Sequence, residues 1–182
     1  MVPLNILTIL VVVFMISILW TNLRGAPWLP TPMSKVYKML AMADVGPNDM
    51  VYDLGCGDGR TIIAAARRYG ARAVGIEIDP LRYLWCQLLI TILRLRGRVQ
   101  IIFGDIFAQD LGDADVVTCY LLPKTNKKLE EKFGQELRPS TRVISNYFNF
   151  PGLQLLREDE EAGIYLYHPV PNHTKTKKGS SL

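Results

Sequence analysis

The hydrophobic pattern of the chain has two parts, one long apolar run at the start and then many short ones. From residue 51 to residue 148 the short runs are rich in Val and Ile and are separated by turn residues and amphipathic stretches. Short apolar runs bounded by turns are typical of strands buried on both faces, as in parallel sheets covered by helices. The pattern therefore predicts an α/β fold around a mostly parallel sheet.

Seven strands and four helices are expected from this pattern and its turn signals. The strands are expected at residues 51–54, 73–77, 99–103, 113–123 with the loop that follows, 142–148, 153–157 and 164–168, the last two as an antiparallel pair. The helices are expected at residues 33–42, 60–66, 81–96 and 124–136. The third helix is nearly all apolar, which fits either a helix covered on both sides or one whose outer face contacts lipid.

The long apolar run predicts a membrane anchor. Residues 4–20 contain only three polar side chains, and no charged residue precedes Arg24. Because the run lacks the basic start and the cleavage site of a signal peptide, we expect an uncleaved transmembrane helix over residues 3–23. Basic residues follow this segment and none precedes it, which predicts a single-pass membrane protein with its folded domain in the cytoplasm.

Three further segments complete the expected organisation. Residues 24–32 form a proline-rich linker, which serves either as a stiff spacer or as a lid over the site that follows. Residues 33–170 form one folded domain. Residues 171–182 form a basic tail that is expected to be disordered.

Composition excludes several classes of function. The 182 residues suffice for one domain with its own core, and the net charge of +4 is too mild to indicate a nucleic-acid partner. The three cysteines form no CxxC pair and the two histidines lie near the C-terminus. We therefore expect no metal site, no disulfide framework and no histidine-based nucleophile.

A glycine-rich turn is the strongest chemical signal. Gly55, Gly57 and Gly59 follow the first expected strand and precede a helix, with Asp53 before them and Asp58 among them. A glycine turn between strand and helix lets the backbone approach a ligand and directs free helix N–H groups toward it.

Two acids follow the next two strands. Glu77 ends the second expected strand, about 20 residues after the glycines, which is where nucleotide-binding units hold ribose hydroxyls, and Asp105 follows the third. An NAD site is disfavoured, because the glycines alternate and Arg60 stands where that fingerprint needs a small residue.

These motifs resemble those of the seven-strand methyltransferases that use S-adenosylmethionine (SAM). The resemblance implies a Rossmann-like, seven-stranded methyltransferase sheet with a terminal antiparallel hairpin, here preceded by the transmembrane helix. It implies that residues 33–170 are the SAM-dependent domain. The cofactor-binding residues that it implies are Asp53, Gly55, Gly57, Asp58, Gly59, Glu77 and Asp105.

A closer resemblance is to the membrane-anchored protein lysine methyltransferases related to the ATP synthase c-subunit lysine methyltransferase. It rests on residues 27–32, 53–60, 120–123 and 137–145. It implies methyl transfer from SAM to a lysine of a membrane-associated protein, with the bilayer as a partner through the N-terminal helix and no nucleic acid. Tyr120, Leu121 and Pro123 would position the substrate amine, and Tyr147 and Phe148 could wall its channel.

Two alternatives remain open at this stage. One is a membrane-associated methyltransferase that acts on a small molecule or lipid, since methyl transfer needs alignment of the reacting atoms more than a dedicated base. The other is a SAM-binding protein without catalysis.

Overall fold

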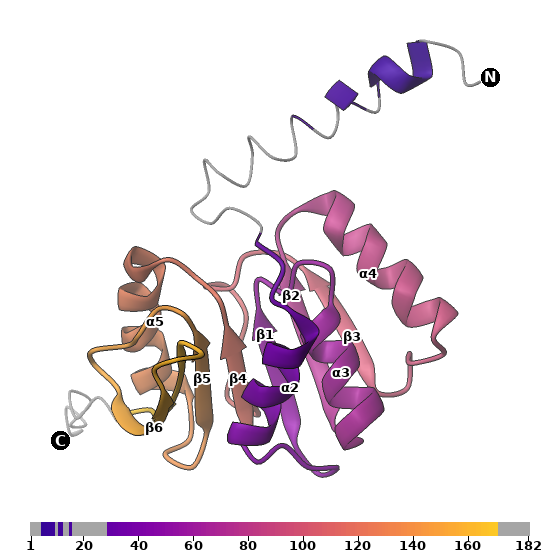
Figure 1. Cartoon of the computed structure of the whole chain (residues 1–182). Helices are drawn as coiled ribbons and strands as arrows, with labels where there is room; N and C mark the ends of the chain where they lie inside the picture. The colour runs from indigo at the N-terminus through magenta and orange to yellow at the C-terminus, as the bar shows by residue number, and fades with distance from the viewer. Residues whose placement is uncertain (1–4, 10, 13–14, 16–28, 171–182) are drawn as a thin grey trace, which may run out of the picture.

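The computed structural model describes residues 5–9, 11–12, 15 and 29–170. Its seven strands form one sheet with the order β3-β2-β1-β4-β5-β7-β6 (Figure 1). The strands are β1 (Met50–Leu54), β2 (Arg72–Glu77), β3 (Val99–Phe103), β4 (Val116–Cys119), β5 (Arg142–Asn146), β6 (Gln154–Asp159) and β7 (Ile164–His168). The helices are α2 (Met33–Met42), α3 (Arg60–Tyr69), α4 (Pro80–Ile92) and α5 (Pro123–Glu136).

The sheet is mixed in the expected way. β1 to β5 run parallel to one another, whereas β7 runs antiparallel between β5 and β6. The chain moves from β1 outward to β3 and then returns to β4 on the other side of β1. This reversal of strand order creates the crevice in which open α/β sheets bind ligands. The predicted Rossmann-like sheet with its terminal hairpin is confirmed.

The helices cover the two faces of the sheet unequally. Because successive side chains of a strand point to opposite faces, Val51 and Tyr52 belong to different hydrophobic clusters. The cluster that contains Val51 also includes the buried residues of α2, α3 and α4, and the cluster with Tyr52 includes those of α5. The fold is therefore a three-layer α/β/α arrangement.

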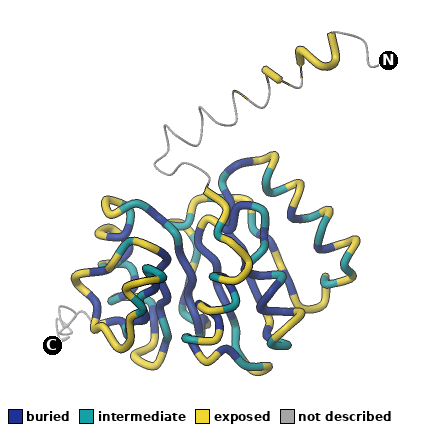
Figure 2. The backbone as a smooth tube through the Cα atoms, in the orientation of Figure 1, coloured by how far each residue is buried: buried dark blue, intermediate teal, exposed yellow. Residues whose placement is uncertain are grey.

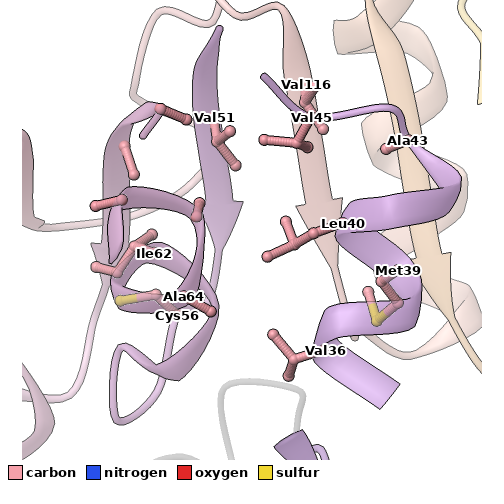
Figure 3. Close-up of a cluster of buried hydrophobic side chains, with 14 of the residues drawn as sticks. Val36, Met39, Leu40, Ala43, Val45, Val51, Cys56, Ile62, Ala64 and Val116 are labelled. Carbon is pink, nitrogen blue, oxygen red and sulfur yellow. The ribbon is translucent and has the colours of Figure 1, made fainter. Parts of the chain in front are cut away.

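Helix α2 covers the middle of the sheet. Its buried residues are Val36, Met39 and Leu40, which have the i, i+3, i+4 spacing of one helix face. They point toward Val116 on the sheet and toward Ile62 on α3 (Figure 3). The position of α2 matters for the site, because the strap of residues 29–32 leads directly into this helix.

Helix α4 does not fit the first of the two alternatives for the apolar stretch, a helix covered on both sides. The helix buries only Cys86 and Ile90, so it is not covered on both sides (Figure 2). Five large apolar side chains on its outer side are 40–64% exposed, namely Leu81, Leu84, Trp85, Leu88 and Ile92. The helix also ends at Ile92 and not near residue 96.

The expected membrane span requires a correction. We expected a transmembrane helix over residues 3–23 and, from it, a single-pass membrane protein with a cytoplasmic domain. Crossing a bilayer takes about 20 consecutive apolar residues in a helix, and none of the helices in the described part of the chain meets that requirement. Residues 5–9, 11, 12 and 15 are helical, and the rest of the predicted segment lies outside the described residues. The structure therefore supports the predicted sheet but does not support the predicted transmembrane helix.

Two other expected segments are described in part or not at all. Residues 24–28 of the linker and the whole tail, 171–182, lie outside the described residues. Residues 29–32 of the linker are described and lie at the cleft.

Gly75 in β2 offers a test of how closely α3 and the glycine turn pack on the sheet. A Cβ added there would lie 2.7 Å from Cys56 Sγ and 2.8 Å from Ile62 Cδ1. Gly75→Ala should lower the free energy of unfolding by about 1–3 kcal/mol, as overpacking of a close-packed core does. Urea denaturation of the purified chain measures this change.

Gly97→Ala is the matched control, because a Cβ at Gly97 would meet no atom within 4 Å. That variant should stay within about 0.5 kcal/mol of the unmodified chain. Equal stability of the two variants would show that α3 and the turn can move away from β2.

Candidate functional site

A cleft of about 390 Å³ lies at the carboxyl ends of β1 to β4. Its walls come from the glycine turn after β1, the acids after β2 and β3, the loop after β4 and the start of α5. Residues 29–31 form one further wall. The cleft volume is within the range of roughly 300–1,000 Å³ that small-molecule sites occupy.

The predicted glycine turn is present between β1 and α3, and its backbone geometry requires glycine. Gly55, Gly57 and Gly59 have φ angles of 75°, 59° and 79°, a region that residues with a Cβ rarely adopt. The N–H groups of Gly55 and Cys56 both donate to the carbonyl of Ile76 at 3.0 Å. The turn is thus fixed to the end of β2, and its residues Gly55, Cys56, Gly57 and Asp58 line the cleft.

Glu77 lines the cleft at the end of β2 and is almost fully buried. Its Oε2 accepts a hydrogen bond from Gly57 N and its Oε1 accepts one from Asp79 N, both at 2.8 Å. Burial raises the pKa of Glu77, and these two backbone donors oppose the shift. A carboxylate has about four acceptor positions, so Glu77 keeps capacity for a ligand.

Asp105 also lines the cleft, after the neighbouring strand β3, and Asp58 lines it from the glycine turn. Asp105 is exposed, and its Oδ1 accepts a hydrogen bond from Phe107 N at 3.0 Å. This short turn directs the carboxylate at the end of β3. The two predicted acids Glu77 and Asp105 are therefore brought together in one cleft.

Asp53 was also predicted to bind the cofactor, but it does not line the cleft. Its side chain is buried beneath the turn, and its Oδ1 accepts a hydrogen bond of 2.6 Å from the hydroxyl of Thr118. Burial raises the pKa of Asp53 to about 6, and hydrogen bonds from Thr118 and Thr61 limit the shift. Asp53 thus contacts β4 through Thr118 and the start of α3 through Thr61.

Of the three residues predicted to position the substrate amine, two line the cleft and one does not. Tyr120 and Leu121 line the cleft after β4, whereas Pro123 does not line it and instead begins α5. The ring of Tyr120 stacks on Phe148 with a centroid distance of 6.3 Å. Phe148 packs edge-on against Tyr147 at 5.3 Å. The three aromatic rings form a row beside the cleft.

A strap across the cleft was not fully anticipated. Asp58 accepts a hydrogen bond from Arg60 Nε at 2.8 Å, and Arg60 Nη1 donates to the carbonyl of Thr31 at 2.5 Å. Asn146 Nδ2 donates to the hydroxyl of Thr31 at 2.9 Å. The strap, residues 29–32, is therefore fixed to the glycine turn on one side and to β5 on the other, which favours the lid over the spacer.

Other residues at the site carried weaker signals in the sequence. Arg82, Lys124 and Lys128 line the cleft and give it a basic side. Cys86 of α4 lies under the glycine turn, where its thiol donates to the carbonyl of Gly57 at 3.2 Å. Charged helix faces and single cysteines are common, so nothing in their spacing marked them.

Comparison with known proteins decides what the cleft serves. Residues 53–157, more than half of the chain, match the family described as the ANTKMT methyltransferase domain. The chain belongs to the ANTKMT methyltransferase family. The resemblance inferred from the motifs is confirmed, and the chain is a SAM-dependent methyltransferase.

Relatives of this methyltransferase include lysine-modifying enzymes. A protein-lysine N-methyltransferase of Saccharolobus islandicus is 43% identical over 69% of this chain and 79% of its own length. The human ATP synthase c-subunit lysine N-methyltransferase is 28% identical over 69% of this chain and 53% of its own length. The chain thus spans about half the length of that second relative.

A solved structure indicates the cofactor. The RNA methyltransferase from Salinibacter ruber, in complex with S-adenosylhomocysteine, is 39% identical to this methyltransferase, with a TM-score of 0.74. The match covers 84% of this chain and all of that one. SAM is therefore the cofactor, and the glycine turn, the two acids and the cleft volume fit it.

The buried carboxyl of Asp53 makes the stability of the folded methyltransferase depend on pH in a predictable direction. Its folded pKa of about 6 is above the unfolded value, so ionisation is harder in the folded state. The contribution of the Asp53 carboxyl to the free energy of unfolding is most favourable below the unfolded pKa of about 3.9, and it is lost as the pH rises toward 6. The loss is about 3 kcal/mol for a shift of roughly two pKa units.

Asp53→Asn should remove this loss, since an amide does not ionise. The difference in unfolding free energy between the variant and the unmodified ligand-free chain should grow in favour of the variant between pH 4 and pH 7. Denaturant unfolding at several pH values measures it. A difference that stays constant over this range would show that Asp53 ionises in the folded chain as easily as in water.

Proposed function

We propose that this methyltransferase transfers a methyl group from SAM to the side-chain amine of a lysine in a protein substrate. The observation that carries the proposal is the 43% identity to a protein-lysine N-methyltransferase over 79% of that relative's length. The row of aromatic rings beside the cleft adds to it, because rings favour a cationic methylammonium product.

The cofactor side of the cleft follows from its hydrogen-bonding groups. We assign the ribose hydroxyls to Glu77 and the adenine side to Asp105, with Gly55, Gly57 and Asp58 along the remainder of the molecule. Gly59 does not line the cleft and instead caps the start of α3. Asp53 does not line the cleft, and its role in cofactor binding is indirect, through its contacts with Thr118 of β4 and Thr61 of α3. When bound, SAM supplies an electrophilic methyl group on a positively charged sulfur.

The acceptor side follows from the loop after β4. Tyr120 and Leu121 form its wall, and Pro123 sets the start of α5 behind them. A lysine has a pKa of about 10.4 in water, so it must lose a proton before it can react. A desolvated channel next to a positive charge disfavours the ammonium form, so this chain needs no dedicated base there.

RNA is a second candidate acceptor. The observation that favours it is the 39% identity to a protein described as an RNA methyltransferase, together with Lys124 and Lys128 at the cleft. We rank it lower because the net charge of +4 is small for a protein that binds a polyanion. A small-molecule acceptor is the third possibility.

One labelling experiment separates these acceptors. The full chain is incubated with tritiated SAM and an extract of the cells that encode it, and the products are treated with protease or with ribonuclease. We expect label that is protease-sensitive and that appears as Nε-methyllysine after acid hydrolysis. Label released by ribonuclease, or label confined to small molecules, would overturn the lysine assignment.

Glu77→Gln tests the cofactor side. Gln keeps an acceptor for one backbone N–H group but loses the charge, and each charge-assisted hydrogen bond contributes about 1.5–3 kcal/mol. The dissociation constant for SAM, measured by calorimetry, should rise about 10- to 100-fold. Glu161→Gln, on the exposed β6–β7 turn, is the control and should bind SAM as the unmodified chain does. Unchanged affinity in Glu77→Gln would remove Glu77 from the ribose site.

A further inference from the structure

The side-chain amide of Asn146 is only half satisfied. Asn146 ends β5 and is 3% exposed. Its Nδ2 donates to the hydroxyl of Thr31, but its buried Oδ1 has no hydrogen-bond partner within the described residues. A buried polar atom without a partner costs free energy, so such an atom calls for a ligand or another specific explanation.

The strand register places this amide beside the cleft. Ser145 of β5 lies opposite Cys119 of β4 in a parallel pair. The next residues, Asn146 and Tyr120, are therefore level with each other at the carboxyl edge of the sheet. Tyr120 lines the cleft, and so does Thr31, the hydrogen-bond partner of Asn146. Asn146 does not itself line the cleft, but it lies directly behind two residues that do.

A second buried amide oxygen, that of Asn126, can be compared with the one of Asn146. Asn126 Oδ1 also lacks a partner in the described part of the chain. Asn126 lies in α5, and its Nδ2 donates at 3.3 Å to the carbonyls of Phe148 and Asn149. Asn126 therefore holds the loop after β5, whereas Asn146 stands at the strand end itself.

The backbone after Asn146 is held in an unusual conformation. Tyr147 has a φ of 70°, which is rare for a residue with a bulky side chain. The N–H of Tyr147 donates to Gly163 O at 2.7 Å, and the hydroxyl of Ser145 donates to Phe148 O. Backbone strain that neighbouring contacts maintain is typical of functional sites.

The surface next to the amide accommodates a primary ammonium group. Lys35 Nζ lies 5.9 Å from the ring centroid of Tyr147, within reach of a cation–π interaction. Phe148 links this ring to Tyr120 at the cleft. An aliphatic amine entering from this side would meet aromatic faces and then the edge of the sheet, where Asn146 ends β5.

We propose that Asn146 Oδ1 accepts a hydrogen bond from the acceptor amine and so directs the amine lone pair toward the methyl group. This inference rests on the proposed lysine substrate. The amine nitrogen forms a bond to the methyl carbon, and the carbon–sulfur bond breaks with its electron pair remaining on sulfur. The one proton that the reaction releases passes to water when the lysine ammonium becomes the reactive amine, and the product leaves as a methylammonium. Asn146 takes no proton in this step.

A neutral acceptor suits this role better than a charged one. A carboxylate at this position would stabilise the ammonium form and so lower the fraction of reactive amine. The charged and titratable groups on the elements around Asn146 include Lys35 and Lys38 of α2, Asp58 and Arg60 at the start of α3, Cys119 and Tyr120 at the end of β4, Tyr165 of β7 and, one strand further out, Asp159 of β6. The two acids are each paired with a cation, Asp58 with Arg60 and Asp159 with Lys38. The amide oxygen thus adds an acceptor without adding a negative charge.

Two variants separate this role from that of holding the strap. Asn146→Leu removes both the amide oxygen and the hydrogen bond to Thr31, whereas Thr31→Val removes only the hydrogen bond. Both are assayed on the protein that the unmodified chain labels most strongly in the cell extract. The labelling rate of Asn146→Leu should be at least about tenfold below that of Thr31→Val, because a misplaced reactant slows the reaction strongly. The two variants should bind S-adenosylhomocysteine equally in calorimetry.

Asn146→Asp provides a readout that a structural role would not change. The pH at which the labelling rate rises should shift upward by about one unit, because the carboxylate favours the ammonium form. This shift remains measurable even if Asn146→Leu folds poorly.

The outcomes are distinguishable. If Asn146→Leu and Thr31→Val have equal rates and Asn146→Asp leaves the pH profile unchanged, Asn146 only holds the strap and the inference is wrong. If the unmodified chain labels no lysine at all, the proposed function fails and the inference fails with it.

Discussion

The carboxylate of Glu77 is the interaction on which the site depends. It ends β2, accepts a hydrogen bond from Gly57 in the glycine turn and accepts another from Asp79 at the start of α4. A buried carboxylate is costly unless donors satisfy it, and here the donors are the backbone of the turn itself. The same group therefore shapes the turn, fixes the start of α4 and presents its remaining acceptor capacity to the cleft.

The parts of this arrangement that depend on local pattern could be predicted from the sequence. Buried apolar runs predicted the strands, and the alternating glycines predicted a tight turn, in which Gly55, Gly57 and Gly59 have positive φ angles. Glu77 and Asp105 both line the cleft, because parallel strands end at one edge of the sheet. Asp53 and Pro123 do not line it, and strand-end spacing alone does not tell whether a side chain faces the cleft or the layer beneath it.

The parts that depend on contacts between distant segments could not be predicted. Thr31 meets Arg60 across 29 positions and Asn146 across 115, and no periodicity signals such pairs. The apolar stretch of α4 predicted a helix but not its exposed outer face, because hydropathy does not tell which neighbours are present. Hydropathy also predicted a membrane span that the described helices do not provide.

The central claim is that one cleft, organised by Glu77, holds SAM and presents its methyl group to the loop after β4. A crystal structure of the chain with S-adenosylhomocysteine tests it most directly. We predict that the ribose hydroxyls bond to Glu77 and that the sulfur lies closer to Tyr120 and Asn146 than to Asp105. A ligand bound outside this cleft, or one whose sulfur faces Asp105, would contradict the account.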